Sequence, residues 1–182
     1  TVATAGRSVQ EIRAGRVDAG LLTLPIEESD LVTVPVMREE LLVVTPPGHP
    51  LARRRRVAPR DLAGQPFVLF EVGSATRHVI DRFFASEKIE PTIVMDTENV
   101  EIIKAMVKTG LGIGIVPYQA IAREVQMGQF FCARVERYEL VRETGWVYAR
   151  ATRTPRMIDE LLTAFGHIRT RLHLAPRWTK SS

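Results

Sequence analysis

Lys108–Ala120 reads KTGLGIGIVPYQA, and this stretch decides the fold. Its glycines alternate with bulky aliphatic residues, and Pro117 ends the run. No Lys-Ser or Lys-Thr pair follows the glycines, so the run is not a phosphate-binding P-loop. The glycine spacing of a dinucleotide-binding loop is absent too, and no helix opens directly from the run. We therefore expect a helix that ends at Gly110, a buried strand over 113–116, and a new helix from Pro117.

The glycines of this run have two interpretations. Gly112 and Gly114 allow a neighbouring backbone to come close, so the run can serve tight helix–strand packing alone. Ligands of open α/β sheets bind beyond the carboxyl ends of the strands, which is where Val116 and Pro117 fall. The sequence leaves both interpretations open.

On either side of this stretch, segments with the periodicity of helices alternate along the chain with segments that have the pattern of strands. Helical periodicity or capping residues predict helices over 9–14, from Ser74, over 99–108, from Pro117 to Gly128, and over 155–172. Ser8 and Glu11 are spaced as a capping box for the first helix, which Gly15 is placed to end. Strands are expected over 17–22, 31–37, 40–45, 67–71, 92–96, 113–116, 130–135 and 145–150. The segment 46–66 is expected to be irregular, with one helical turn at 59–64. This alternation predicts an α/β fold, mainly parallel, with two small sheets rather than one large one.

Composition indicates a globular chain able to bury a core. The 182 residues are 45% hydrophobic and 25% charged, with a net charge of +4. No apolar run reaches the roughly 18 residues that a membrane span needs. Cys132 is the only cysteine, which excludes an intrachain disulfide framework and fits a reducing, cytoplasmic compartment. We expect Cys132 to be a small core residue.

The basic run Arg53–Arg56 follows PPGHPLA and lies in an expected loop. We interpret it as a solvated charge run, since no helix-turn-helix, zinc finger or RNA-binding pattern accompanies it. Catalytic motifs are missing as well: there is no nucleophile elbow, no H-E-x-x-H pattern, and no clustering of the four histidines. The sequence thus predicts a protein that is not an enzyme and that holds no cofactor or metal.

Four segments resemble one family. IRAGRVDAGLL, REELLVVTPPGHPLA, RDLAGQPFVLFEVGSATRHVIDRFF and VKTGLGIGIVP are similar, in order and spacing, to the effector-binding domain of LysR-type transcriptional regulators. The resemblance extends over about residues 7–172. It implies a periplasmic-binding-protein-like fold of two α/β subdomains joined by two crossover strands, with a small effector in the cleft between them. Subdomain I would be 1–39 with 147–175, subdomain II 40–146, and 176–182 a tail.

The resemblance also implies what lies elsewhere. Family members begin with a winged helix-turn-helix, a linker helix, and the first strand and helix of subdomain I. We see none of these in the sequence, so we expect an N-terminally truncated chain whose Thr1 falls at the second strand. DNA binding would then belong only to the missing N-terminal domain. The family's side-by-side pairing implies a homodimer or tetramer through the regulatory domain, with no membrane partner.

The expected site is a set of helix N-termini, whose unpaired amides and partial positive charge favour anionic groups. Ser74, Arg77 and Asn99 have plainer interpretations: Ser74 and Asn99 can simply cap their helices, and Arg77 can point to solvent. The predicted ligand-binding residues are Arg7, Ser8, Gly73, Ser74, Thr76, Arg77, Asn99, Val116 and Pro117. The alternative function is a solute-binding protein of a transport system with the same fold.

Overall fold

The computed structural model describes residues 5–26, 28–150 and 156–169. They form two compact units. The first contains the described residues up to Arg38 and those from Arg142 onward, and the second is Glu39–Val141. The chain therefore leaves the second unit at Val141, a few residues before the boundary expected at 146. The predicted tail, 176–182, lies outside the described residues, as do Thr1 and the expected start of the last helix, where Thr154 could cap it and Pro155 suits its first turn.

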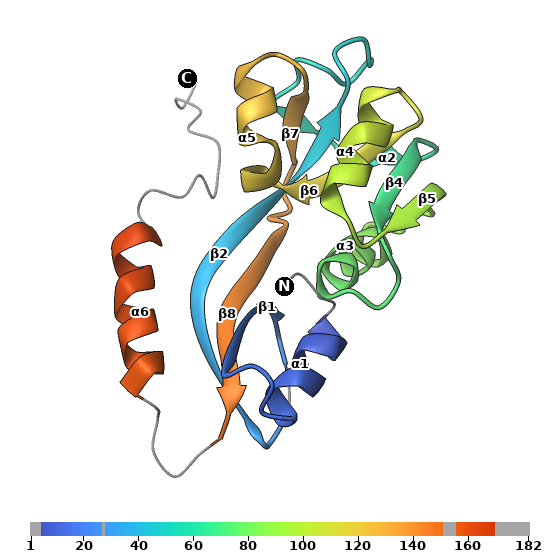
Figure 1. The fold of residues 1–182 in the computed structure, drawn as a ribbon. Coiled ribbons are helices and arrows are strands. Elements are labelled where there is room, and N and C mark those ends of the chain that lie inside the picture. The colour runs from blue at the N-terminus through green and yellow to red at the C-terminus, as the bar shows by residue number, and fades with distance from the viewer. Residues whose placement is uncertain (1–4, 27, 151–155, 170–182) are drawn as a thin grey trace. The chain divides into compact units, whose positions relative to one another are not determined.

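The first unit has a small antiparallel sheet with a helix on each face (Figure 1). Strand β1 (Ala19–Leu24) pairs with β8 (Val141–Ala149), and β8 lies next to β2 (Leu31–Thr45). Helix α1 (Ala5–Arg13) buries Val9 and Ile12 in a cluster with Leu22, Leu24, Leu31 and Val147. Helix α6 (Arg156–Arg169) contacts the sheet through Phe165, whose ring lies 6.0 Å from that of Trp146. Neighbouring strand residues such as Trp146 and Val147 point to opposite faces, so the two helices cover opposite faces.

The predicted capping box at the first helix is wrong. The helix begins at Ala5, so Ser8 lies within it rather than before it. The carboxylate of Glu11 instead binds the guanidinium of Arg16, at 2.5 and 3.0 Å. The predicted stop is confirmed, because Gly15 takes φ +64°, which a side chain would disfavour.

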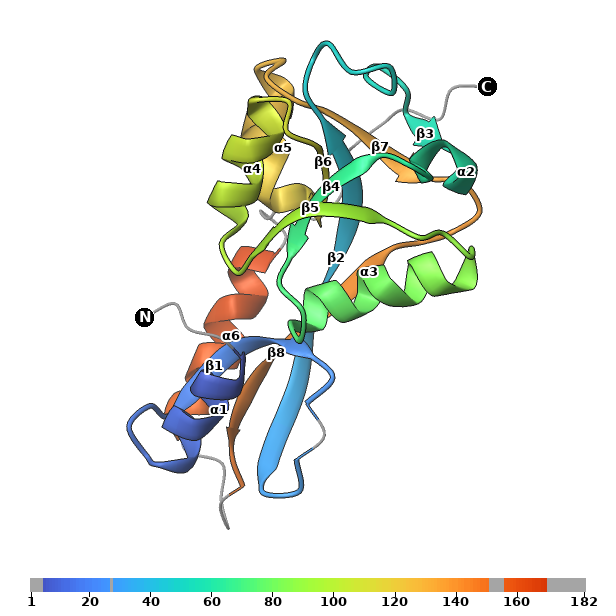
Figure 2. The same ribbon diagram turned by 90° about the vertical axis from the view of Figure 1, so that its right-hand side faces the viewer.

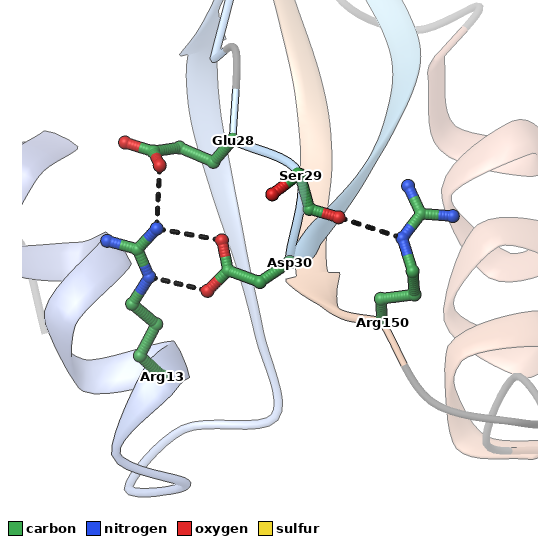
Figure 3. Close-up of polar contacts among 5 residues, drawn as sticks. All are labelled: Arg13, Glu28, Ser29, Asp30 and Arg150. Atoms are coloured by element: carbon green, nitrogen blue, oxygen red, sulfur yellow. Dashed lines mark hydrogen bonds and ion pairs between the residues drawn. The ribbon is translucent and has the colours of Figure 1, made fainter.

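The turn that leads into β2 is held from both sides (Figure 3). Arg13, at the end of α1, donates to both carboxylate oxygens of Asp30, at 2.6 and 2.7 Å, and to Glu28 at 2.6 Å. Arg150, just after β8, donates to the carbonyl oxygen of Ser29 at 3.0 Å. These contacts join the end of α1, the start of β2 and the end of β8 within the first unit.

The second unit is a mixed sheet with helices between its parallel strands (Figure 2). The sheet order is β2-β6-β4-β5, and β7 also pairs with β2. Parallel pairing joins β4 to β5, β4 to β6 and β3 to β7, whereas β2 runs antiparallel to β6 and β7. The elements are β3 (Arg56–Val57), α2 (Pro59–Leu62), β4 (Pro66–Phe70), α3 (Ala75–Ser86), β5 (Thr92–Thr97), α4 (Val100–Lys108), β6 (Ile113–Pro117), α5 (Tyr118–Gln126) and β7 (Phe131–Val135).

Three expectations about these elements need correction. The two strands expected over 31–37 and 40–45 are one 15-residue strand, β2, because no turn-forming residue separates them. The expectation of mainly parallel pairing holds only for β4, β5, β6 and the short β3–β7 ladder. The helical periodicity that predicts a helix over 99–108 places Ile102 inside with Ile103 and Val107, but Ile102 is 38% exposed, because α4 presents only one face to the sheet.

The glycine run is a point of close packing. A Cβ on Gly112 would lie 2.6 Å from the carbonyl oxygen of Pro66, at the start of the neighbouring strand β4. A Cβ on Gly114 would lie 3.1–3.3 Å from Val44, Ile103 and Val107. The packing interpretation of these glycines is therefore confirmed. Among the described residues, no helix has both the length and the apolar character needed to cross a bilayer.

Candidate functional site

The candidate site is the edge of the second unit's sheet where three parallel strands end. Strands β4, β5 and β6 are each followed by a helix: α3, α4 and α5 respectively. Because β5 and β6 flank β4 on opposite sides, right-handed crossovers place α3 and α4 on opposite faces of the sheet. The strand order therefore reverses between β4 and β6. In open α/β sheets, ligands bind at such a reversal, beyond the carboxyl ends of the strands.

The junction between β4 and α3 holds Gly73 and Ser74. Gly73 takes φ +92°, a left-handed conformation that permits the sharp turn into the helix. The hydroxyl of Ser74 accepts a hydrogen bond from the amide of Arg77 at 3.1 Å, so the predicted N-cap is confirmed. Capping uses one of the first-turn donors, while the amide of Ala75, at the first helical position, has no acceptor within the helix.

Arg77 does not point to solvent, which was its plainer interpretation. Its side chain is 8% exposed. Nη1 donates to the carbonyl oxygen of Phe70 at 3.0 Å, and Nε donates to Asp81 at 2.7 Å. The guanidinium thus joins α3 to the last residue of β4. Thr76, its neighbour, is also buried.

The junction between β5 and α4 is acidic. Asn99 caps α4 by accepting from the amide of Glu101 at 2.9 Å, as predicted. Glu98 hydrogen-bonds Glu71, which follows β4, and this contact, with burial and the charges of Glu98 and Asp96, raises the pKa of Glu71. Negative charge here opposes the binding of an anion close to Asn99.

The junction between β6 and α5 is different. Val116 and Pro117 are both buried, and Pro117 stands at the cap position with no side chain able to accept a hydrogen bond. No acidic residue occupies the first turn of α5. The cap residue therefore leaves these first-turn amides to other acceptors, among them solvent or a ligand. Among the three helix N-termini at this sheet edge, that of α5 is the best suited to bind an anionic group.

Sequence reasoning missed the residues that shape this edge. Val72 is 70% exposed between β4 and α3, although it is apolar. The contact between Glu71 and Glu98 was not predicted, because their proximity depends on β4 and β5 being neighbours. Only the pairing of the strands brings them together.

Arg7 and Ser8 belong to the first unit. Both lie near the start of α1, where Arg7 is exposed and Ser8 half-buried. The amides of this first helical turn have no acceptors within the helix.

The described residues give little support to metal binding or to a nucleophilic cysteine. The described part of the chain has no group of three or more His, Cys, Asp and Glu arranged to hold a metal ion. Cys132 is buried in β7, opposite Val44, and burial raises the pKa of its thiol to about 12. A thiol of this kind is a poor nucleophile at neutral pH.

The sequence of residues 1–167 matches the family model described as LysR substrate binding domain. The chain belongs to this LysR family. A RuBisCO operon transcriptional regulator from Allochromatium vinosum is 31% identical over 145 residues, which are 80% of this chain and 48% of that protein. A probable RuBisCO transcriptional regulator from Cyanophora paradoxa is 31% identical over 167 residues, 85% of this chain and 51% of its own length. The chain thus spans about half the length of these curated relatives.

Solved structures confirm the LysR fold. The regulatory domain of Synechocystis PCC6803 CcmR, in complex with 2-PG, aligns with a TM-score of 0.82 at 18% identity, over 93% of this chain and 81% of that one. The effector binding domain of QuiR, in complex with shikimate, aligns with a TM-score of 0.79 at 19% identity, over 93% and 79% of the two chains. The periplasmic-binding-protein-like α/β fold expected from the sequence is the fold of these LysR regulatory domains.

Proposed function

We propose that this chain is the effector-sensing regulatory domain of a LysR-type transcriptional regulator, and that it binds a small anionic metabolite. In the second unit, the anion lies at the strand-order reversal between the β4–α3 and β6–α5 junctions. The observation that carries the proposal is the start of α5, where buried Val116 and Pro117 lead into a first turn whose amides the cap residue Pro117 cannot cap.

The residues of the two junctions have different roles in this proposal. Gly73, Ser74 and Thr76 shape the β4–α3 turn, and the amides after Pro117 bind the anion. Arg77 acts as a positioning residue, because its guanidinium is occupied by Phe70 and Asp81. Asn99 borders the site on its acidic side, where a hydroxyl or cationic part of the ligand is favoured over a second anion. Arg7 and Ser8 stay predicted ligand residues on α1.

The relatives support a regulator over a transport protein. The curated relatives are transcriptional regulators, and the related CcmR and QuiR domains are described with small molecules bound. We propose accordingly that the whole protein acts in the cytoplasm, contacts DNA through a domain outside this chain, and performs no catalysis.

A thermal-shift screen of small carboxylates and phosphates tests the site. A bound anion raises the melting temperature by mass action, and Gln119→Glu reduces this effect because it adds a negative charge to the first turn of α5. We expect the dissociation constant to rise by at least about tenfold. Gln126→Glu, the same change at the far end of α5, is the matched control. A panel without any stabilising anion, or equal effects of the two variants, would contradict the proposal.

We also propose that the domain forms a homodimer or tetramer through the edge strand β5. Strand β5 ends the sheet order, and Ile93 and Val94 on it are 37% and 43% exposed, with Ile102 of α4 at 38%. An exposed apolar sheet edge is a site of association. Light scattering coupled to gel filtration should show that Val94→Lys lowers the oligomeric mass, whereas Met127→Lys, at a residue 60% exposed elsewhere, leaves it unchanged.

A further inference from the structure

The basic charge of the chain is gathered in one surface segment of the second unit. Residues 53–61 contain five arginines and one aspartate, and the rest of the chain has twenty basic and twenty acidic residues. The net charge of +4 is therefore the charge of this one segment. We call Arg53, Arg54, Arg55, Arg56 and Arg60 the arginine patch.

The structure presents this patch to solvent. All five arginines are exposed, whereas Leu51, Val57 and Leu62 around them are buried in the core of the second unit. Strand β3 anchors the segment by pairing with β7, and the amide of Arg134 donates to the carbonyl oxygen of Arg55 at 3.0 Å. Helix α2 follows directly and carries Arg60. The patch is thus attached at both ends to ordered elements.

Within residues 53–61, Asp61 is the one carboxylate that accompanies the five arginines of the patch. The carboxylate of Asp61 accepts hydrogen bonds from Arg54 at 3.1 Å and from the amide of Ala58. It therefore stabilises the start of α2 as well as pairing with one arginine. Glu136 borders the patch, since its amide donates to the carbonyl oxygen of Val57. The carboxylate of Glu40 accepts hydrogen bonds from Nε and Nη2 of Arg134, which is outside the patch. The segment 53–61 therefore has a formal excess of positive charge, which is exposed on the surface of the second unit.

We propose that the arginine patch is a second contact surface for the phosphate backbone of duplex DNA. Its basic residues are all arginine, whose planar guanidinium matches phosphate oxygens in pairs. No aromatic residue lies among residues 53–60, which disfavours stacking on single-stranded bases and favours contacts without sequence preference. The choice of DNA over an acidic protein rests on the proposed function. A transcriptional regulator is bound to DNA, and that DNA is a polyanion next to the protein.

The test measures binding of the 182-residue chain to a labelled duplex of arbitrary sequence by fluorescence anisotropy, over about 50 to 200 mM salt. The variant Arg53→Gln/Arg56→Gln/Arg60→Gln removes three charges of the patch. Its matched control, Arg82→Gln/Arg123→Gln/Arg156→Gln, removes three exposed charges elsewhere. We expect the patch variant alone to bind more weakly, with the slope of log affinity against log salt smaller by about 2.7. Melting temperatures of both variants establish that they are folded.

Three outcomes would overturn the proposal. They are no binding of the unchanged chain at low salt, equal losses in both triple variants, and competition by polyglutamate as strong as that by duplex DNA at equal charge. The last would assign the patch to an acidic protein. Effector binding is measured separately by the thermal shift, so a failure here leaves that result unaffected.

Discussion

Arg77 in helix α3 donates a hydrogen bond from Nη1 to the carbonyl oxygen of Phe70, the last residue of β4, at 3.0 Å. The bond is buried and crosses the turn that contains Gly73 and Ser74. A charged side chain predicted to meet a ligand thus holds the wall of the candidate site in place. Loss of the Arg77 side chain should therefore lower the stability of the fold more than it changes which ligand is bound.

We expect Arg77→Ala to lower the free energy of unfolding by about 2–3 kcal/mol, since it removes charge-assisted hydrogen bonds at a buried position. Asp81→Asn keeps the bond to Phe70 and weakens only the half-exposed pair, so its cost should stay below about 1 kcal/mol. Urea denaturation of both variants measures the difference. Equal costs would show that the bond to Phe70 contributes nothing.

Gly112→Ala should destabilise the second unit. The added methyl group would lie 2.6 Å from the carbonyl oxygen of Pro66, which belongs to the backbone and cannot rotate away. The cost of such overpacking is about 1–3 kcal/mol. Gly48→Ala is the control, because nothing lies within 4 Å of its added carbon. Chemical denaturation of the pair decides whether the glycine run is required for packing.

Cys132 should not react in the native protein. Burial, reinforced by the charge of Glu40, raises the pKa of its thiol to about 12, so almost no thiolate is present at pH 7. Titration with a chromogenic disulfide reagent should label one thiol only after unfolding in guanidinium. Labelling of the folded chain within minutes would contradict this burial.

The carboxyl pair Glu71 and Glu98 predicts a pH dependence of stability. Because the pKa of Glu71 is raised in the folded protein, its stabilising contribution is present below the ordinary pKa of a glutamate and is lost as pH rises through the raised value. Glu98→Gln removes one charge but keeps a hydrogen-bonding group. We expect this variant to unfold at a higher temperature than the unchanged chain at pH 7, and to lose less stability between about pH 4 and pH 6.

Glu90→Gln, which neutralises an exposed carboxylate outside this pair, serves as the control for that experiment. It should leave the pH profile of melting temperature unchanged. If Glu98→Gln gives the same profile as Glu90→Gln, the two carboxyls do not interact in solution.

Local signals predicted the elements well where chemistry is local. Ser74 and Asn99 cap the helices that they were expected to cap, and Gly15, Gly110 and Gly128 take positive φ values after helices. The signals failed where the outcome depends on partners. The capping box at Ser8 was overridden by the pairing of Glu11 with Arg16. Strand β2 continues through residues 38–39, where a break was expected.

The site shows the same division. The starts of α3, α4 and α5 follow from the sequence, because the strand–helix alternation fixes where each of these junctions falls. The directions of side chains do not. Arg77 is turned inward by the carbonyl oxygen of Phe70, seven residues earlier in the chain, and Glu71 meets Glu98 only because β4 and β5 are neighbours. Tertiary contacts of this kind leave no periodicity in a single sequence.

The way in which the chain is divided between the two units predicts the order in which they fold during synthesis. Among the described residues, the second unit is one continuous segment, Glu39–Val141, whereas the first needs residues on both sides of it. As the ribosome releases the chain, β1 and the early part of β2 must wait for β8 before their sheet can close. We therefore expect nascent chains arrested after Val141 to resist protease over 39–141 while the N-terminal segment is still cut.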